Sequence, residues 1–316
     1  MLIMKKELKK RNNTKLDRLK EDIPIAVKII SYVIMTLLSF TCIVPLWLTI
    51  SISFTDEEVL GLNGYSFFPD KFSLDAYKYV IENGKDIFQS FGVTVFITIV
   101  GVFVGLFLMS MFAYAVTRKD FPWKNQFGFF VYFTMLFHGG MVSSYIINTT
   151  VFHLRDTIWI LIISGMVSAY NLMIMRTYMR TSIPDEVIES AKIDGAGEFT
   201  CFYKFALPMA VPMLATIALF MTVAYWNNWS TGLLYIVKRN DLVPIQLMLK
   251  RIENNIAFIA NNEAAMATDI EAYEKNFPME SFRMALTMMV ALPMLVVYPF
   301  FQKYFVKGVT VGAVKG

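Results

Sequence analysis

The sequence predicts an all-α polytopic membrane protein with six transmembrane helices. Of its 316 residues, 56% are hydrophobic and only 17% are charged. The mean hydropathy is +0.51, which is too high for an ordinary soluble domain. Crossing a bilayer takes about 20 mostly apolar residues. Six windows without Asp, Glu, Lys or Arg approach or exceed this length: residues 29–55, 87–117, 125–154, 157–175, 205–237 and 284–302.

The distribution of basic residues predicts the orientation of these spans. The segments 1–22, 117–126, 176–208 and 303–316 hold 18 Lys and Arg, whereas 53–86, 147–156 and 238–280 hold nine. Because Lys and Arg collect on the cytoplasmic side, both termini are predicted to be cytoplasmic in a multi-pass plasma-membrane protein. The net charge of +4 reflects this bias and does not indicate nucleic-acid binding.

The predicted organisation is a basic cytoplasmic tail, residues 1–22, followed by one six-span domain, residues 23–316. The tail is expected to lie on anionic membrane lipid, which attracts Lys and Arg. The apolar segment that follows the tail is longer than the hydrophobic region of a signal peptide, which argues against a cleavable signal peptide. Residues 56–86 and 238–280 are predicted external loops, and residues 176–208 a cytoplasmic loop.

The first span carries Pro45 and leads into external loop 56–86. This loop is rich in aromatic residues that could pack as a small cap or anchor at the membrane interface: Tyr65, Phe67, Phe68, Phe72, Tyr77 and Tyr79. In the second span, Gly101 and Gly105 form a small-xxx-small pair that permits close helix approach. In the third span His138 precedes Gly139 and Gly140, and is a candidate either for lining a pore or for packing beside a glycine kink.

The fourth span, residues 157–175, ends near Tyr170 and Asn171, and Arg176 marks its inner boundary. The fifth ends in AYWNNWSTG, where Tyr225, Asn228, Trp229 and Gly232 would share a helical face. Aromatic rings and amides suit a sugar, because pyranose rings stack and hydroxyls hydrogen-bond, although an interfacial aromatic belt is the alternative. The candidate substrate-path residues are His138, Tyr170, Asn171, Tyr225, Asn227, Asn228 and Trp229.

The second external loop, residues 238–280, is long and polar, is expected to be partly helical, and is a natural contact site for an external partner. After the sixth span the chain ends in FVKGVTVGAVKG. Its two valine-glycine turns predict an ordered tail.

The segment SIPDEVIESAKIDGAGEFTCFYKFALPMAVP, residues 182–212, concentrates charge, glycine and proline between apolar windows. A capping box of Ser182 and Asp185 predicts the start of a short amphipathic helix, which ends at Gly195 and Gly197. A second helix is predicted from Glu198 to Leu207. From pattern alone this segment is either an amphipathic loop on the bilayer or a docking surface.

Common catalytic signatures are missing. The sequence contains no GxxxxGK[ST], GxSxG or HExxH motif and no Cys/His cluster. Cys42 and Cys201 fall in different environments, which predicts no disulfide. The sequence therefore indicates that the chain is no enzyme and needs no cofactor or metal of its own.

Glu189-Ser190-Ala191, three residues, Gly195, nine residues and then Phe205-Ala206-Leu207-Pro208 closely resemble the EAA loop of binding-protein-dependent ABC importer permeases. Ser190 and Phe205 are mild departures from that pattern. Together with WNNW and the terminal GVTVGAVKG, the segment resembles the maltose-type carbohydrate permeases, and within them the lipoprotein-associated subgroup for oligosaccharides or polysaccharide fragments. The resemblance covers the chain from about residue 25 to its end.

This resemblance implies the type I ABC importer permease fold, a coupling helix that docks on a cytoplasmic ATPase, and uptake of an oligosaccharide. The partners it implies are a second homologous permease, two ABC ATPase subunits that bind ATP and Mg, and an external solute-binding lipoprotein. The residues it assigns to coupling are Glu186, Glu189, Ser190, Ala191, Asp194, Gly195, Ala196, Leu207 and Pro208.

Two other function classes compete with this interpretation. A membrane-embedded enzyme acting on lipid-linked sugar would need paired carboxylates or a metal cluster near one membrane face, and the spans offer neither. A channel or secondary carrier would need intramembrane ion-coordinating groups or inverted repeats, and no convincing repeat is present. The absence of Lys and Arg from the spans disfavours selection of a highly anionic glycan by this subunit, unless its partner permease supplies the charge.

Overall fold

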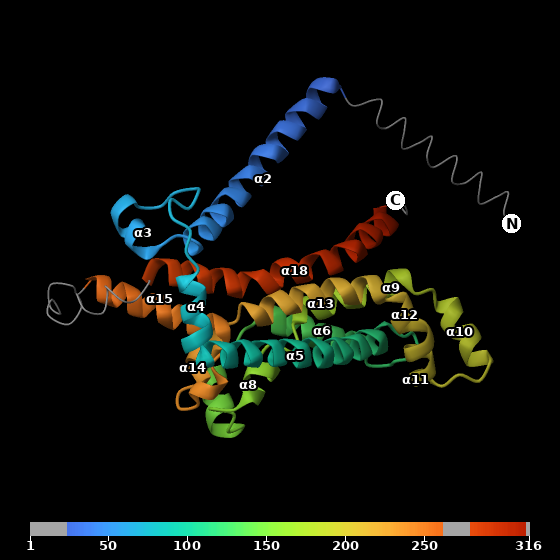
Figure 1. Ribbon diagram of the computed structural model, residues 1–316. Coiled ribbons are helices and arrows are strands. Elements are labelled where there is room, and N and C mark those ends of the chain that lie inside the picture. The colour runs from blue at the N-terminus through green and yellow to red at the C-terminus, as the bar shows by residue number, and fades with distance from the viewer. Residues whose placement is uncertain (1–23, 262–278, 314–316) are drawn as a thin grey trace.

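The computed structural model describes residues 24–261 and 279–313 (Figure 1). Within these ranges the regular secondary structure is helical, and a single isolated bridge joins Thr55 and Phe72. The predicted all-α membrane fold is confirmed. The basic tail and the part of the second external loop at residues 262–278 lie outside the described residues.

Three helices are long and apolar enough to cross a membrane: α2 (Ile25–Ser53), α5 (Lys85–Thr117) and α18 (Met279–Ala313). The 33 residues of α5 correspond to about 50 Å at 1.5 Å per residue. Helix α18 contains Pro293 and Pro299 and continues to Ala313. The prediction of two valine-glycine turns near the carboxyl terminus is therefore wrong, because α18 continues through these residues.

The window 125–154 is a bent pair of helices. Helix α6 (Lys124–Leu136) and helix α7 (Gly140–Ile146), which continues as the π-helix η1 (Ile147–Val151), meet at an angle of 112°. The break contains His138, and Gly140 has a φ of +83°, a backbone conformation that glycine adopts without a Cβ clash. The predicted glycine kink is confirmed.

The fourth and fifth windows are also interrupted. Residues 157–175 are divided between α8 (Ile158–Ile163) and α9 (Ala169–Ser182), so this window holds no continuous span. Further on, the helical segment 198–209 meets α13 (Val211–Trp226) at 77°, near Pro208 and Pro212, which cannot donate backbone hydrogen bonds. Counting each bent pair as one, up to five spans appear among the described residues.

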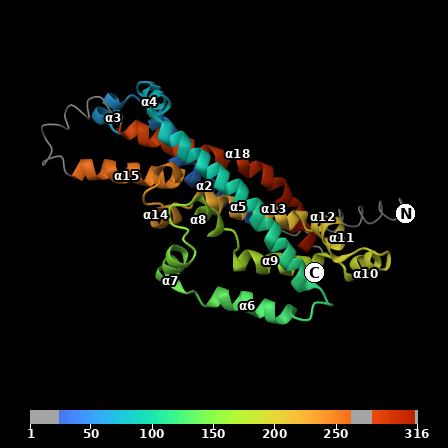
Figure 2. The same cartoon turned by 90° about the horizontal axis from the view of Figure 1, so that it is seen from below.

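Helices α5, α13 and α18 run side by side through the middle of the molecule (Figure 1). Helices α6 and α7 lie along one side of this bundle (Figure 2). Gly101 and Gly105 permit the close approach, because a Cβ on Gly101 would lie 2.3 Å from the Tyr225 ring and one on Gly105 would lie 2.4 Å from the Met166 carbonyl oxygen. In contrast, the amino-terminal part of α2 leaves the bundle with its apolar side chains exposed.

The end of the bundle that is predicted to be external is built from α3 (Glu57–Asn63), α4 (Asp75–Asn83), α14 (Ser230–Tyr235), η3 (Asn240–Leu242) and α15 (Ile245–Asn261). The aromatic cap forms there: Phe54 stacks on Phe72 and Tyr77, and the indole N–H of Trp47 donates to the Phe67 carbonyl. Tyr65, Phe67, Phe68 and Phe72 nevertheless remain 50–71% exposed, so part of this loop packs as a cap and part still offers aromatic rings to a membrane interface.

Two carboxylates tie this end together. The Glu57 carboxylate accepts hydrogen bonds from the backbone N–H groups of Glu280 and Ser281 and from the Ser281 hydroxyl, at 2.7–2.9 Å. Asp156 accepts from the backbone N–H groups of Val237 and Lys238 at 2.7 and 2.8 Å. These backbone hydrogen bonds, led by that of Lys238, lower the pKa of Asp156.

The opposite end carries α10 (Asp185–Ile193), α11 (Glu198–Thr200), the π-helix η2 (Cys201–Ala206) and α12 (Leu207–Met209). A buried cluster joins this end to α5, α9 and α13 through Met109, Ala113, Met175, Met179, Ile217 and their neighbours. The charged segment singled out in the sequence is thus packed onto the core of the bundle.

Candidate functional site

Helix α10 begins differently from the predicted capping box. Ser182 is the last residue of α9, and Pro184 precedes the first residue of α10 without a side-chain cap. The capping-box prediction is wrong, because Ser182 still belongs to α9, Pro184 occupies the N-cap position, and the Asp185 carboxylate is engaged by basic side chains of another turn. Asp185 and Glu186 still lie in the first turn, where the helix dipole favours negative charge.

The two faces of α10 differ in chemistry. Ile188 and Ala191 are buried, 2% and 5% exposed, and they pack in the cluster that contains Cys201, Phe202 and Ala206. The outward face carries Glu186, Glu189, Ser190 and Ile193, and the Ile193 side chain is 85% exposed. An acidic, partly apolar face on a firmly packed helix is suited to contact another protein.

A tight bend follows α10, as the glycines predicted. Gly195 has a φ of +86°, and the N–H of Ala196 returns to the Ala191 carbonyl at 2.9 Å. These backbone bonds satisfy carbonyl groups at the end of α10. Asp194 and Gly195 lie exposed on the bend, whereas Ala196 is half-buried and contacts the core cluster.

The helical segment 198–209 then leads back to the bundle. Cys201, Phe202 and Ala206 are at most 3% exposed and fix the segment to the core, with Leu207 packed against the same cluster. Pro208 is exposed near the 77° bend into α13. The predicted second helix is confirmed and extends two residues beyond Leu207.

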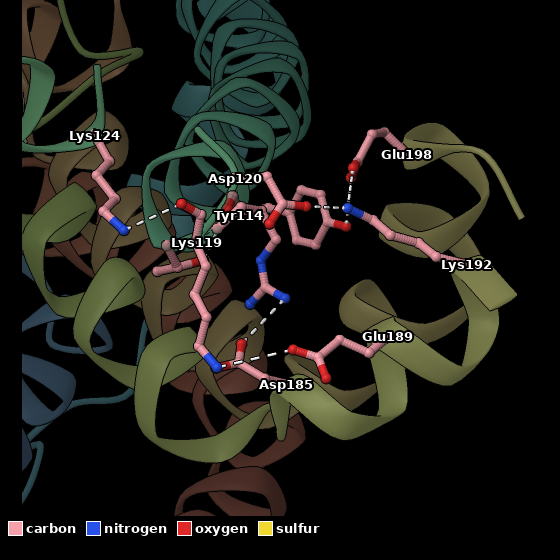
Figure 3. A network of polar contacts seen from close by, with 10 residues as sticks. Tyr114, Lys119, Asp120, Lys124, Asp185, Glu189, Lys192 and Glu198 are labelled. Carbon is pink, nitrogen blue, oxygen red and sulfur yellow. Dashed lines mark hydrogen bonds and ion pairs between the residues drawn. The ribbon is translucent and has the colours of Figure 1, made fainter. Parts of the chain in front are cut away.

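Basic side chains of the turn between α5 and α6 hold the start of α10 (Figure 3). Lys119 Nζ lies 3.0 Å from Asp185 Oδ2 and 3.8 Å from Glu189 Oε1, and Arg118 Nη1 lies 3.6 Å from Asp185 Oδ1. The hydrogen bond to Asp185 raises the pKa of Lys119. Arg118 also stacks over the Tyr114 ring, 4.9 Å from its centroid.

A second set of contacts holds the end of α10 (Figure 3). Lys192 Nζ lies 2.5 Å from both Asp120 Oδ2 and Glu198 Oε1, and the Tyr114 hydroxyl donates to Glu198 Oε2 at 3.1 Å. The hydrogen bonds that Lys192 donates to Asp120 and then to Glu198 raise the pKa of Lys192, and the bond from Lys192 lowers the pKa of Asp120. Both ends of α10 are therefore bonded to the α5–α6 turn or the helix after the bend.

The result is a short helix that cannot move independently of its surroundings. Apolar packing holds the inner face of α10, and ion pairs bridge each end to elements far away in sequence. A force on the exposed face would pass to α5 and α13 as a rigid-body displacement.

The residues that complete this arrangement were not predicted. Lys119 pairs with Asp185 and Lys192 pairs with Asp120 across the site. Tyr114 of α5 donates a hydrogen bond to Glu198 beside them. The signal was present in opposite charges, because the turn 118–126 contains Arg118, Lys119 and Lys124 while the first turns of α10 are acidic. Sequence distance concealed it, since Asp120 and Lys192 are 72 positions apart.

The proposed sugar-facing stripe in the fifth span does not form. Helix α13 ends at Trp226 and α14 starts at Ser230, so helical spacing does not continue from Tyr225 to Gly232. Tyr225 is 2% exposed, and its hydroxyl donates to the Ile162 carbonyl at 2.5 Å. The shared-face prediction is wrong because Asn227 and Asn228 interrupt the helix.

The two asparagines make local contacts. Asn227 Oδ1 accepts from the Gln246 amide at 3.1 Å, and Asn228 Oδ1 accepts from the backbone N–H of Thr231 at 3.1 Å, at the start of α14. Of the other substrate-path candidates, His138, Tyr170 and Trp229 are exposed, whereas Asn171 is buried in the first turn of α9. These residues lie at helix ends or breaks and do not form one cluster with Tyr225.

Residues 122–311 match the family described as binding-protein-dependent transport system inner membrane component. The polygalacturonan/rhamnogalacturonan transport system permease protein YtcP of Bacillus subtilis is 35% identical over 90% of this chain and 96% of its own. Protein LplC of the same organism is 37% identical over 87% of this chain and 90% of the LplC sequence.

This chain is similar to a chain in the solved structure of a bacterial ABC transporter involved in the import of the acidic polysaccharide alginate. The two chains share 26% sequence identity and a TM-score of 0.76, covering 89% of this chain and 96% of that one. These relatives support a transport permease rather than a membrane-embedded enzyme or a secondary carrier, with ATP hydrolysis in a separate subunit. This chain belongs to the family of binding-protein-dependent transport system inner membrane components, and it is a multi-pass membrane permease of an ABC importer.

Proposed function

We propose that this permease imports an oligosaccharide or polysaccharide fragment that an external solute-binding protein delivers. The printed names of its relatives support a carbohydrate, since they include polygalacturonan/rhamnogalacturonan and arabinooligosaccharide permeases. The spans contain little charge that would select an acidic glycan, so sugar hydroxyls and ring faces are the groups to be recognised. Exposed Tyr170, Trp229 and His138 are the candidate contacts along the path.

The observation that carries the mechanism is the exposed acidic face of α10 on a helix bonded at both ends. We propose that Glu186, Glu189 and Ser190 dock on an ATPase subunit, and that Asp194, Gly195 and Ala196 set the angle of the helix to the segment behind it. Ala191, Leu207 and Pro208 would then connect that helix to α13. ATP and Mg would bind to the partner, and closure of two ATPase subunits would move α10 as a unit.

This proposal includes an orientation and an assembly. The α10 end faces the cytoplasm together with both termini, as the bias of Lys and Arg supports. The end with α3, α4 and α15 faces outward, where the binding protein would approach. A second homologous permease completes the path, and the exposed apolar surface of α2 is available to that subunit or to membrane lipid.

Reconstitution tests the docking assignment. The permease pair and its ATPases are placed in proteoliposomes, and co-purification of the ATPase, ATP hydrolysis and sugar uptake are measured. Glu189→Lys should leave the protein in the membrane but reduce ATPase retention and abolish substrate-stimulated hydrolysis, because it reverses the charge of the exposed face. Glu82→Lys, an equal charge reversal on exposed α4 at the other end, should retain the ATPase normally. Normal uptake by the Glu189→Lys transporter would remove the docking assignment.

A separate measurement tests the substrate. The cognate binding protein is titrated with neutral oligosaccharides and with oligogalacturonides, and the ligand that binds is then followed into proteoliposomes. Uptake of a carbohydrate of either kind supports the proposal, and the comparison says whether acidic groups are carried. Uptake of an amino acid or an ion, with no carbohydrate bound, would refute it.

A further inference from the structure

A polar cavity lies beside the coupling surface and shares Arg118, Lys119 and Asp185 with the ion pairs that hold the start of α10. Its volume is about 290 Å³, and its charged lining is Arg118, Lys119, Lys124, Arg176, Arg180 and Asp185. These residues come from the turn after α5, the start of α6, the second half of α9 and the start of α10. Four segments of the chain thus direct charged side chains toward one small volume.

The charge of this cavity is strongly positive. Five basic side chains meet one carboxylate, and Asp185 is already shared between Arg118 and Lys119. The contribution of Lys124, Arg176 and Arg180 is not offset by a second acidic residue in the lining. Like charges placed together at this density destabilise the fold unless an anion joins them.

Buried donors in the cavity are left without acceptors. Arg118 is 7% exposed, and its Nε has no hydrogen-bond partner among the described residues. The same holds for Nε of Arg176, whose guanidinium lies over Gly128 of α6. Arg118 still pairs with Asp185 through Nη1, and Arg176 is half-buried, so it is the Nε–H group of each arginine that lacks an acceptor. Because a buried charged donor without an acceptor is costly, these two Nε–H groups favour an additional acceptor at this site.

The start of α6 lies at the same place, although the N–H of Lys124 already donates to the Phe121 carbonyl. Lys124 and Asn125 line the cavity and are the first two residues of this 13-residue helix, and Trp123 before them supplies no side-chain cap. First-turn N–H groups and the positive end of the helix dipole favour an anion with several oxygens. Arginine forks match the same geometry in phosphate and carboxylate groups.

We propose that this cavity binds a phosphate group, and that its source is the headgroup of an anionic phospholipid. The surroundings favour the lipid over free phosphate, because Trp123 and Phe127 of α6 are 59% and 43% exposed beside the cavity and offer an apolar surface to acyl chains. Aromatic side chains of this kind settle at the headgroup level of a bilayer. A lipid bound here would join α5, α6, α9 and α10 at the base of the coupling helix.

Native mass spectrometry of the full-length chain in detergent tests this proposal. The titrants are phosphatidylglycerol, phosphatidylcholine with the same acyl chains, and inorganic phosphate. Phosphatidylglycerol should bind more tightly than phosphatidylcholine, and Arg180→Gln should weaken that binding about tenfold, which corresponds to about 1.4 kcal/mol. Arg180→Lys should retain most of it, and Lys204→Gln, which removes an exposed cation from the same end of the molecule outside the cavity, should change nothing.

The other outcomes are equally distinct. If inorganic phosphate binds with the same dependence on Arg180 and phosphatidylglycerol does not, the phosphate site stands and its source is free phosphate. If Arg180→Gln and Lys204→Gln bind phosphatidylglycerol equally well and also bind inorganic phosphate equally well, the proposal is overturned. A cavity that is filled by a carboxylate of a partner subunit would give this result. Thermal unfolding of each variant checks the fold, and Lys124→Gln replaces Arg180→Gln if the latter does not fold.

Discussion

At the scale of single residues, Gly101 and Gly105 of α5 determine how closely the bundle packs. A Cβ at Gly105 would lie 2.4 Å from the backbone oxygen of Met166 and 2.5 Å from the Met221 methyl group, whereas one at Gly92 meets nothing within 4 Å. The sequence indicated the close approach only as a small-xxx-small pair. The structure identifies the neighbouring atoms, and backbone atoms cannot withdraw without moving the whole segment.

Gly105→Ala should therefore lower the stability of the folded permease by about 1–3 kcal/mol through overpacking. The matched control is Gly92→Ala in the same helix, which should be neutral or stabilising by roughly 0.5–1 kcal/mol because it removes a flexible glycine from a helix. Thermal unfolding in detergent compares the two variants. Equal stability of both would mean that α5 and its neighbours are not in contact at Gly105.

Tyr225 is the residue whose assigned role changed most. In the sequence it belonged to a sugar-facing stripe, but in the structure its ring lies against Gly101 and Gly165 and its hydroxyl reaches Ile162. Its chemistry suits either role, so residue type could not distinguish them. The end of α13 at Trp226 removes the shared helical face, and the burial of Tyr225 favours packing.

Tyr225→Phe should cost about 1 kcal/mol of stability, because it leaves the buried Ile162 carbonyl without this donor, and it should leave substrate preference unchanged. Tyr170→Phe, at an exposed position, should not affect stability. Unfolding temperature and the relative uptake of two sugars are the measurements. A changed sugar preference with normal stability would restore Tyr225 to the substrate path.

At the scale of elements, α10 depends on the bend that follows it. Gly195 and Gly197 both have open space where a Cβ would stand, but only Gly195 has a positive φ, +86°. Crowding is therefore not the reason for glycine at residue 195, and the backbone conformation is. The two positions form a matched pair in which sterics are equal and only the dihedral differs.

Gly195→Ala should strain the bend by about 1–2 kcal/mol and change the angle of α10, which should reduce sugar-dependent ATP hydrolysis in the reconstituted transporter. The φ of Gly197 is −71°, which alanine adopts without strain. Gly197→Ala should therefore keep the sugar-dependent ATP hydrolysis close to that of the unsubstituted chain. Coupling that is lost equally in both variants would assign the effect to the added methyl group and not to the positive φ.

The ion pairs of α10 have a defined pH window. Lys192 has a raised pKa, so its contribution is complete below its ordinary value of 10.5 and is lost only as pH rises through the raised value. Asp120 has a lowered pKa, so its contribution is complete above 3.8 and is lost as pH falls through the lowered value. Between these limits the charge state of the pair does not change.

Hydrogen exchange of residues 185–193, corrected for the intrinsic rate, should therefore be constant over about pH 5–8. Lys192→Met should increase exchange near the end of α10 over the same range, because both Asp120 and Glu198 lose their partner. A transition within this range in the unsubstituted protein would show that another titrating group controls the helix.

At the scale of the whole molecule, the end of the bundle with α3, α4 and α15 is held by contacts between distant parts of the chain. Glu57 binds the start of α18, 223 and 224 positions later, and so connects the first loop to the last long helix. Three donors converge on one carboxylate, and one of them is the Ser281 hydroxyl. This contact and the α10 network lie at opposite ends of α5.

Glu57→Ala should destabilise the permease by about 1–3 kcal/mol, because the donors at the start of α18 lose their acceptor. Glu58→Ala removes the neighbouring exposed carboxylate and should have little effect. Limited proteolysis of the external loops together with thermal unfolding would detect the difference. Equal behaviour of the two variants would leave Glu57 without a role in holding α18.

The sequence by itself determined the membrane class, the position of the charged segment, the glycine bend and the family, because each is written in local composition or in spacing within about 30 residues. Only the tertiary structure decided where the spans break, that Tyr225 is a packing residue, and that Lys119, Asp120 and Lys192 hold α10. The physical reason is that ion pairs and close helix contacts join residues far apart in the chain. Hydropathy averages over a window and does not register such pairs.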